Sequence, residues 1–284
     1  MINKGLILEG GGMRGIYTAG VLDYFFDHGL RFKYIYGVSA GACHGCSYIS
    51  GQRGRAASTV LDFVNDCRYG SFRNWFMTGD YFGEKFVYRD VPDTLLPFDY
   101  TAFQASEQIL YATVTNVETG QAEYIPLKEL KQDTNWLRAS ASLPLLSRLV
   151  KIDGKYYLDG GIADSIPLAK SIADGHTENL TVLTRHKGYQ KQPNTSHIMR
   201  FSYRKYPAFV NTIALRHEVY NESLRLIDSE ANMGRALVIQ PNEEVKIGRL
   251  EKNTAKLRAL YDDGYRDAKA CVTSHPAFFT EDLT

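Results

Sequence analysis

Two short stretches of the sequence have the residue types and spacing of a nucleophilic catalytic site. Gly37-Val38-Ser39-Ala40-Gly41 follows the G-x-S-x-G pattern, in which the flanking glycines relieve crowding around a serine on a strained turn between a strand and a helix. Gly10 to Gly15 reads Gly-Gly-Gly-Met-Arg-Gly, and a glycine loop at the start of a helix can point backbone N–H groups at a developing negative charge. Together the two stretches predict a serine nucleophile, Ser39, beside an oxyanion hole.

The glycine loop also matches G-x-G-x-x-G at Gly10, Gly12 and Gly15. A dinucleotide site of that type needs an acidic residue about 20 residues further on, at the end of the second strand, to hold the ribose. Here the second strand ends in Gly37-Val38-Ser39 without a carboxylate, and the sequence contains no G-x-x-x-x-G-K phosphate loop. A nucleotide-binding module is therefore the less favoured alternative, and we expect no cofactor.

Cys43 and Cys46 have the C-x-x-C spacing of a redox or metal motif. The chain has four cysteines and no second pair at that spacing, so we expect neither a zinc site nor a disulfide framework. Gly41 and Gly45 share one helical face, which predicts a helix that packs closely against the sheet and holds Ser39 rigidly.

A serine hydroxyl needs a base to accept its proton. His44 lies on the helix that leads away from Ser39, and His275 alone among the histidines suits the order Ser, Asp, His of α/β-hydrolases. Asp159 ends the stretch Lys-Tyr-Tyr-Leu-Asp and is followed by Gly160 and Gly161, which allow close approach of the backbone. A Ser39/Asp159/His275 triad stays open, but Asp159 acting directly as the base is the better candidate.

Composition narrows the classes of protein. The 284 residues carry a net charge of +1, so no global field attracts nucleic acid. The first residues are too poor in apolar side chains for a signal peptide, and no run approaches the roughly 18 apolar residues of a spanning helix. We expect one domain over residues 1–284 of a cytoplasmic protein, which a lipid substrate could bring to a membrane surface.

The elements that must position these residues follow from hydrophobic periodicity. A strand, a crossover helix and a second strand fit within Gly5 to Ser39, and their strands should be parallel. Later segments predict helices, an edge hairpin and further strands in one mixed sheet between helices. These segments are helices at 40–50, 53–67, 207–233 and 250–273, a hairpin around 118–120, and strands ending at Asp159, at Arg185 and near Pro241.

Two further segments bear on the substrate. Nine aromatic residues lie between Phe72 and Tyr100, where a lid or acyl groove and ordinary packing are equally favoured. They are Phe72, Trp75, Phe76, Tyr81, Phe82, Phe86, Tyr88, Phe98 and Tyr100. From Arg185 to His217 there are seven basic residues and no acidic one, which suits phosphate headgroups or, more simply, a solvated loop. They are Arg185, Lys187, Lys191, Arg200, Arg204, Lys205 and Arg216.

Gly10–Gly15, Gly37–Gly41 and Asp159–Gly161 resemble, in content and order, the three signatures of the patatin-like phospholipase family, and Arg138–Gly161 is similar to the family's approach to its aspartate. The resemblance covers about residues 5–173. It implies a three-layer α/β/α fold with a mainly parallel sheet and hydrolysis of lipid acyl esters by a Ser39–Asp159 dyad without histidine. It also implies an oxyanion hole made by the N–H groups of Gly11, Gly12 and Met13 or Arg14, and C-terminal elements packed on the same core.

Overall fold

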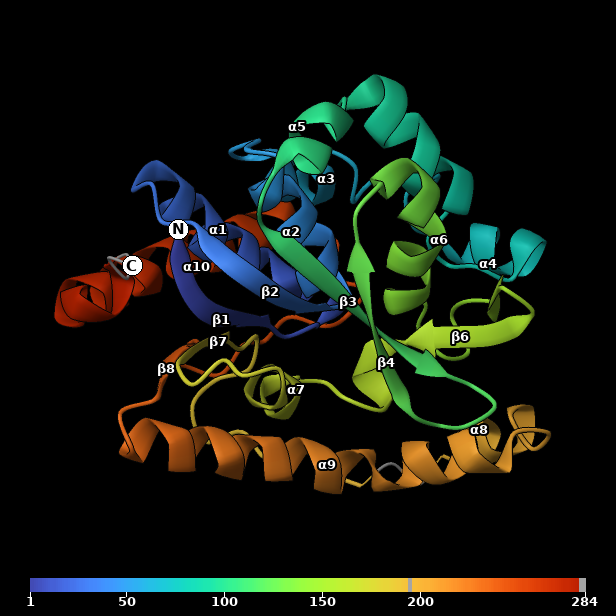
Figure 1. Ribbon diagram of the computed structural model, residues 1–284. Helices are drawn as coiled ribbons and strands as arrows, with labels where there is room; N and C mark the ends of the chain where they lie inside the picture. Colours follow the sequence, from blue (N-terminus) through green and yellow to red (C-terminus); the bar gives the residue numbers. More distant parts are fainter. Residues whose placement is uncertain (194–195, 281–284) are drawn as a thin grey trace.

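The computed structural model describes residues 1–193 and 196–280 (Figure 1). Within them eight strands form one sheet in the order β5-β6-β3-β2-β1-β7-β8, with β4 paired to β3. The strands are β1 (Ile2–Leu8), β2 (Phe32–Val38), β3 (Ile109–Asn116), β4 (Ala122–Leu127), β5 (Val150–Ile152), β6 (Lys155–Asp159), β7 (Asn179–Val182) and β8 (Ala236–Ile239).

The centre of the sheet is parallel. β1 pairs in parallel with β2 and β7, β2 with β3, and β7 with β8. Antiparallel pairing is confined to one side, where β3 pairs with β4 and β6 and β5 pairs with β6. The predicted parallel unit within Gly5 to Ser39, the hairpin and the mixed, mainly parallel sheet are thereby confirmed.

Helices cover both faces of the sheet (Figure 1). One layer contains α1 (Ile16–Asp27), α2 (Ala40–Ile49), α3 (Arg55–Leu61), α5 (Tyr100–Ala105), α6 (Leu130–Ser140) and α10 (Thr254–Ser274). The opposite layer contains α7 (Leu168–Ala173) and the long α9 (Pro207–Asn232). The remaining helices are α4 (Phe72–Thr78) and α8 (His197–Ser202), with a π-helical segment at Phe86–Leu95.

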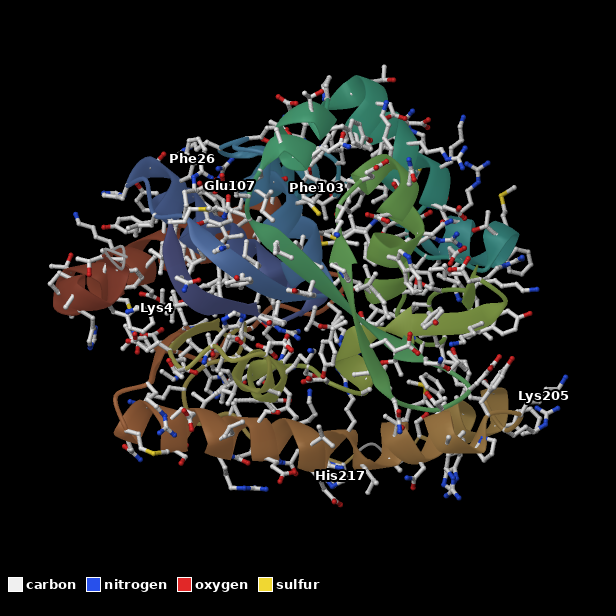
Figure 2. The ribbon with its side chains drawn as sticks, viewed as in Figure 1. Lys4, Phe26, Phe103, Glu107, Lys205 and His217 are labelled. Carbon is white, nitrogen blue, oxygen red and sulfur yellow. The ribbon has the colours of Figure 1, made fainter. Side chains whose placement is uncertain are left out.

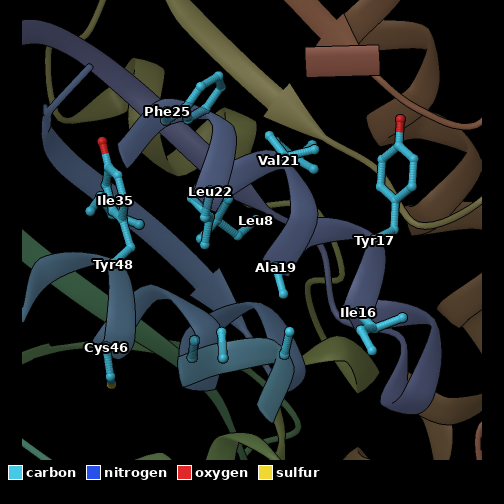
Figure 3. Close-up of a cluster of buried hydrophobic side chains, with 14 of the residues drawn as sticks. Leu8, Ile16, Tyr17, Ala19, Val21, Leu22, Phe25, Ile35, Cys46 and Tyr48 are labelled. Carbon is cyan, nitrogen blue, oxygen red and sulfur yellow. The ribbon is translucent and has the colours of Figure 1, made fainter. Parts of the chain in front are cut away.

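Strand β1 shows why both faces need a helical layer. Leu6, Ile7 and Leu8 are consecutive apolar residues, and all three are fully buried. A continuous apolar run of this kind is typical of a strand that is covered on both faces. Leu6 and Leu8 belong to the core that contains α1, whereas Ile7 packs on the opposite side with Tyr220 of α9. Figure 3 shows the first of these cores, with Leu8 beside side chains of α1.

The C-terminal helix is fixed to the first one by two glycines. A Cβ atom on Gly20 would lie 2.0 Å from the carbonyl oxygen of Tyr261, and one on Gly264 would lie 2.1 Å from that of Tyr17. Hydrogen bonds from the Tyr17 hydroxyl to Asp267 and from the Tyr261 hydroxyl to Asp23 add to this contact. The crossing of α1 and α10 therefore depends on the absence of side chains at both glycines.

Several segments differ from the sequence predictions. The helix expected at 53–67 is α3, which ends at Leu61, because the chain then continues in turns. Helices α5, α6, α7 and α8 were not predicted, and the aromatic segment 72–100, for which no secondary structure was predicted, contains α4 and the π-helical segment. Among residues 1–193 and 196–280, none of the helices has both the length and the apolar character that a bilayer crossing requires.

Candidate functional site

Ser39 occupies the sharp turn that the sequence predicts. It lies between β2 and α2 with φ 54° and ψ −121° and is 5 % exposed. A positive φ is costly for a residue with a side chain and must be held in place by its surroundings. The flanking glycines make this possible, since a Cβ on Gly37 would lie 2.5 Å from Cα of Ala42 and one on Gly41 2.4 Å from the carbonyl oxygen of Leu8.

Asp159 reaches Ser39 through the shared neighbour β3. Val38, the last residue of β2, pairs with Thr113, and Asp159, the last residue of β6, pairs with Val114. Because β2 runs parallel to β3 and β6 runs antiparallel to it, the two strands point at each other along β3 and end at adjacent positions. Asp159 and Ser39, the residue after Val38, are therefore brought together.

The Asp159 carboxylate is 3 % exposed. Its Oδ1 accepts a hydrogen bond from the Gly161 N–H at 2.8 Å, while Oδ2 has no partner within the described part of the chain. Burial raises the pKa of Asp159, and the nearby Ser39 hydroxyl, Arg216 and the Gly161 N–H offset part of that rise. The result is a buried carboxylate beside Ser39 with one oxygen available to accept a proton.

The glycine loop touches the serine. A Cβ on Gly10 would lie 2.8 Å from Cβ of Ser39, and one on Gly15 would lie 2.5 Å from Cβ of Ala40. Gly15 therefore serves packing, because it lets the start of α1 approach α2. Gly12 has φ +58°, and a side chain there would meet the carbonyl oxygen of Arg249 at 2.7 Å.

The N–H groups of this loop have different partners. The Met13 N–H donates to the carbonyl oxygen of Arg249, and the Arg14 N–H donates to that of Gly11, both at 3.3 Å. The N–H groups of Gly10, Gly11 and Gly12 have no acceptor among residues 1–193 and 196–280. These three glycines therefore have N–H groups left free to donate a hydrogen bond.

Ser39 stands in the wall between two cavities. The polar cavity, of about 30 Å³, is lined by the glycine loop, Asp159 and five basic residues. These are Arg14, Arg185, Lys191, Arg216 and Arg249. Glu9 lies in the same wall, but its carboxylate already accepts hydrogen bonds from Thr184 and Tyr220.

The second cavity is apolar and larger, about 160 Å³. Its wall combines α2 and α3 with the segment predicted as a lid or groove. Four of the nine aromatics line it: Phe82, Tyr88, Phe98 and Tyr100. Phe72, Trp75 and Phe76 are instead exposed on α4, so the aromatic segment both lines the cavity and contributes to the surface.

His275 is remote from the site. It lies just before Phe279, whose ring packs against Phe32 at 6.3 Å. Phe32 begins β2 and Ser39 follows its end, so at about 3.3 Å per residue the strand separates the two ends by roughly 20 Å. The structure therefore does not assemble the Ser39/Asp159/His275 triad kept open from sequence.

The Cys43-His44-Gly45-Cys46 stretch forms part of the apolar wall. Burial lowers the pKa of His44 to about 4 and raises that of Cys43 to about 12. These side chains are therefore neutral near pH 7, which suits packing and not proton transfer. In the described chain Cys43 and Cys46 are both free.

The basic segment 185–217 divides into two groups. Arg185, Lys191 and Arg216 reach the polar cavity, whereas Lys187, Arg200, Arg204 and Lys205 are exposed to solvent. Lys205 and His217 are labelled on the outer side of α8 and α9 in Figure 2. Residues 194 and 195 of this segment lie outside the described residues.

Three contributors to the site escaped sequence reasoning. The Ser140 hydroxyl accepts the Ser39 N–H at 2.9 Å, Tyr220 holds Glu9, and Arg249 supplies both a carbonyl oxygen behind Gly12 and a cation. The only local signal was Glu9, an acidic residue directly after a buried strand. Ser140 and Arg249 have no motif around them, because their roles depend on tertiary contact.

Comparisons with known proteins bear on the family of this chain. The family described as patatin-like phospholipase matches residues 6–171, and a domain of unknown function, DUF6363, matches residues 206–280. The protein YjjU of Escherichia coli K12, described as uncharacterized, is 29 % identical over 60 % of this chain and 48 % of its own length. Lysophospholipase NTE1 of Meyerozyma guilliermondii is 29 % identical over 58 % of this chain and 11 % of its own length.

Among solved structures, VipD from Legionella pneumophila has a similar fold. The TM-score is 0.51 at 14 % identity, and the match covers 97 % of this chain and 67 % of that one. At this identity the likeness concerns the fold alone. The chain spans about half of the length of YjjU and about a tenth of that of NTE1.

Proposed function

Since this chain belongs to the patatin-like phospholipase family, we propose that it hydrolyses acyl esters of lipids with Ser39 as nucleophile and Asp159 as base. The observation that carries the proposal is the meeting of Ser39, the available Asp159 oxygen and the free glycine N–H groups between a polar and an apolar cavity. A single-chain phospholipid is the favoured substrate class, in line with the name lysophospholipase of several relatives.

In the first half of the reaction Ser39 Oγ attacks the ester carbonyl while Asp159 accepts the hydroxyl proton. The oxyanion formed at the carbonyl oxygen accepts hydrogen bonds from the N–H groups of Gly11 and Gly12. When the intermediate collapses, the C–O bond to the alcohol breaks and the alcohol takes the proton from Asp159. The acyl group is then bound to Ser39.

In the second half a water molecule attacks the acyl-serine and gives its proton to Asp159. Collapse of the second intermediate releases the fatty acid, and the proton returns to Ser39 Oγ. A free aspartate titrates near 3.9 and is a weak base for a serine hydroxyl. Burial raises the pKa of Asp159 and so makes it a stronger base. The oxyanion hole has to supply much of the remaining stabilisation of the transition state. We expect esters to react more readily than amides, because an alcohol leaves more readily than an amine.

We also propose peripheral contact with a membrane. Leu145 connects α4 with the end of α8: its carbonyl oxygen accepts a hydrogen bond from the Trp75 indole N–H, and its N–H donates to the hydroxyl of Tyr203, the residue after α8. Exposed apolar side chains cluster on these helices: Phe72, Phe76, Met77, Ile198 and Phe201. Exposed Arg73, Arg200 and Arg204 accompany them, which suits an anionic lipid surface. Free cysteines in the described chain are consistent with a cytoplasmic location.

The test is release of fatty acid from a lipid panel by wild type and three variants. We expect Ser39→Ala and Asp159→Asn to lower kcat by about 10⁴-fold or more, in line with the loss of a nucleophile or base in serine hydrolases. His275→Ala is the matched control and should keep wild-type rates. Near-normal activity in Asp159→Asn would contradict the dyad, and failure of folded wild type to react with a fluorophosphonate would contradict the nucleophile.

A further inference from the structure

The polar cavity beside Ser39 has an excess of positive charge. Five basic side chains line it against two carboxylates, Glu9 and Asp159. Glu9 is engaged by Thr184 and Tyr220, and neither carboxylate forms an ion pair within 4.0 Å with these cations in the described residues. Buried like charges repel one another unless an opposite charge is near. This cavity therefore has the electrostatics of a site for an anion.

Three cations of this cavity, Arg14, Lys191 and Arg216, support this reading. Arg14 is 5 % exposed, and its Nε has no hydrogen-bond partner in the described part of the chain. Burial, together with Arg216, Arg249 and Arg185, lowers the pKa of Lys191 to about 7. Burial likewise lowers the pKa of Arg216 to about 10, with Arg249 contributing. A bound dianion would satisfy the free Arg14 donor and favour the charged forms of its neighbours.

The position of the two cavities indicates which kind of molecule would carry the anionic group. Ser39 lines both, so a substrate with its ester at Ser39 extends one way into the apolar cavity and the other way into the cationic one. In a glycerol lipid only a few bonds separate the ester from the phosphate. A phosphate monoester carries about two negative charges, whereas a diester with choline or ethanolamine carries one and adds a positive charge, so the five basic side chains suit a terminal phosphate better.

The cations come from three parts of the chain, and Arg185 and Lys191 lie between the two segments that match known families. Arg14 belongs to the segment that matches the patatin-like family, whereas Arg216 and Arg249 lie in residues 206–280, which match a domain of unknown function. Tyr220, which holds Glu9, lies in the second segment too. The C-terminal segment thus supplies part of the lining of the cavity next to the nucleophile, and does not merely cover the sheet.

We infer that the cationic cavity binds the phosphate monoester of a single-chain lipid, a monoacylglycerol phosphate, and that residues 206–280 supply Arg216 and Arg249 for its recognition. This inference rests on the proposed lipid hydrolase function. The acyl chain occupies the apolar cavity, the ester lies at Ser39 and the glycine loop, and the terminal phosphate faces Arg14, Arg185, Lys191, Arg216 and Arg249.

The experiment compares kcat/KM for monooleoylglycerol phosphate and neutral monooleoylglycerol. We expect wild type to prefer the phosphate ester by about 10-fold to 100-fold, the range for charge-assisted hydrogen bonds. Arg185→Gln and Arg249→Gln should each lower that ratio by about 10-fold, mainly through KM. The matched control is Lys205→Gln, a cation of the same basic segment on the outer surface (Figure 2), which should leave the ratio unchanged.

A binding measurement identifies the source of the phosphate and does not depend on turnover. In calorimetry with Ser39→Ala, glycerol 3-phosphate should bind more tightly than inorganic phosphate, and Arg249→Gln in the same background should weaken it. Tight binding of inorganic phosphate without preference for the phosphate lipid would overturn the inference in favour of a free-phosphate site. Hydrolysis of the neutral ester with no preference would overturn it too but leave the proposed function standing, whereas absence of Ser39-dependent hydrolysis of any ester would overturn the proposed function itself.

Discussion

The two cavities that meet at Ser39 are built by different means. The polar cavity is formed by loops at strand ends and by charged side chains from distant parts of the chain. The apolar cavity is formed by the faces of α2 and α3 and by aromatic side chains of the segment 72–100. This fold therefore places Ser39 between a wall rich in charge and a wall nearly free of it.

Burial acts on both walls but with different outcomes. In the apolar wall it lowers the pKa of His44 to about 4 and raises that of Cys43 to about 12, so both are uncharged near neutral pH. In the polar wall Asp159 has Arg216 and the Gly161 N–H nearby, which favour its ionised form against the effect of burial. Only the wall with compensating partners can keep a usable base.

Apart from the loss of Ser39 or Asp159 itself, the largest effect should come from disturbing the polar wall at Gly12. In Gly12→Ala the new Cβ would clash with the Arg249 carbonyl and strain a positive φ, which displaces an oxyanion donor. We expect kcat to fall by about 10² to 10³. Gly29→Ala is the matched control, because Gly29 also has a positive φ, +67°, but open space around it. Equal losses in the two variants would show that backbone strain, and not the oxyanion hole, causes the effect.

A smaller effect should follow from filling the apolar wall. Ala56 lines the apolar cavity, and its neighbour Ala57 is equally buried in α3 but does not line it. We expect Ala56→Phe to lower kcat/KM for a long-chain ester by about 10-fold while sparing a butyrate ester, since pocket fit is worth 10-fold to 200-fold. Ala57→Phe controls for overpacking. A loss that is independent of chain length would argue against this cavity as the acyl site.

The smallest effect is a displacement of the acid limb of activity. Because burial raises the pKa of Asp159, the base becomes protonated, and activity is lost, as the pH falls through a value above the ordinary 3.9 of aspartate. The pH profile of kcat/KM on a neutral ester measures this. Asp164→Asn is the control, since burial also raises the pKa of Asp164 outside both cavities. A limb at or below 3.9, or one moved in Asp164→Asn, would refute the assignment.

The spacing of apolar residues predicted the strands and helices that have a clear apolar pattern of their own. The alternation and apolar runs of residues 5–39 indicated a parallel strand pair and its helix, and α9 was expected within a residue of its observed end. Helix α6 was missed because its sequence, Leu130–Ser140, is polar on most positions and is helical where it packs on β3 and β6. The role of Ser140 was missed with it, since a serine at a helix end has no pattern of its own.

By itself the sequence determined the nucleophile turn, the glycine loop and the aspartate at a strand end, because each needs particular residues within a few positions of one another. Their assembly was decided by the tertiary structure: β2 and β6 end at adjacent positions of β3. The same holds for the cationic cavity, whose residues Arg14, Lys191, Arg216 and Arg249 are brought together from distant positions by packing around the sheet. Such long-range contacts are paid for by burial over the whole domain, so no short stretch of sequence records them.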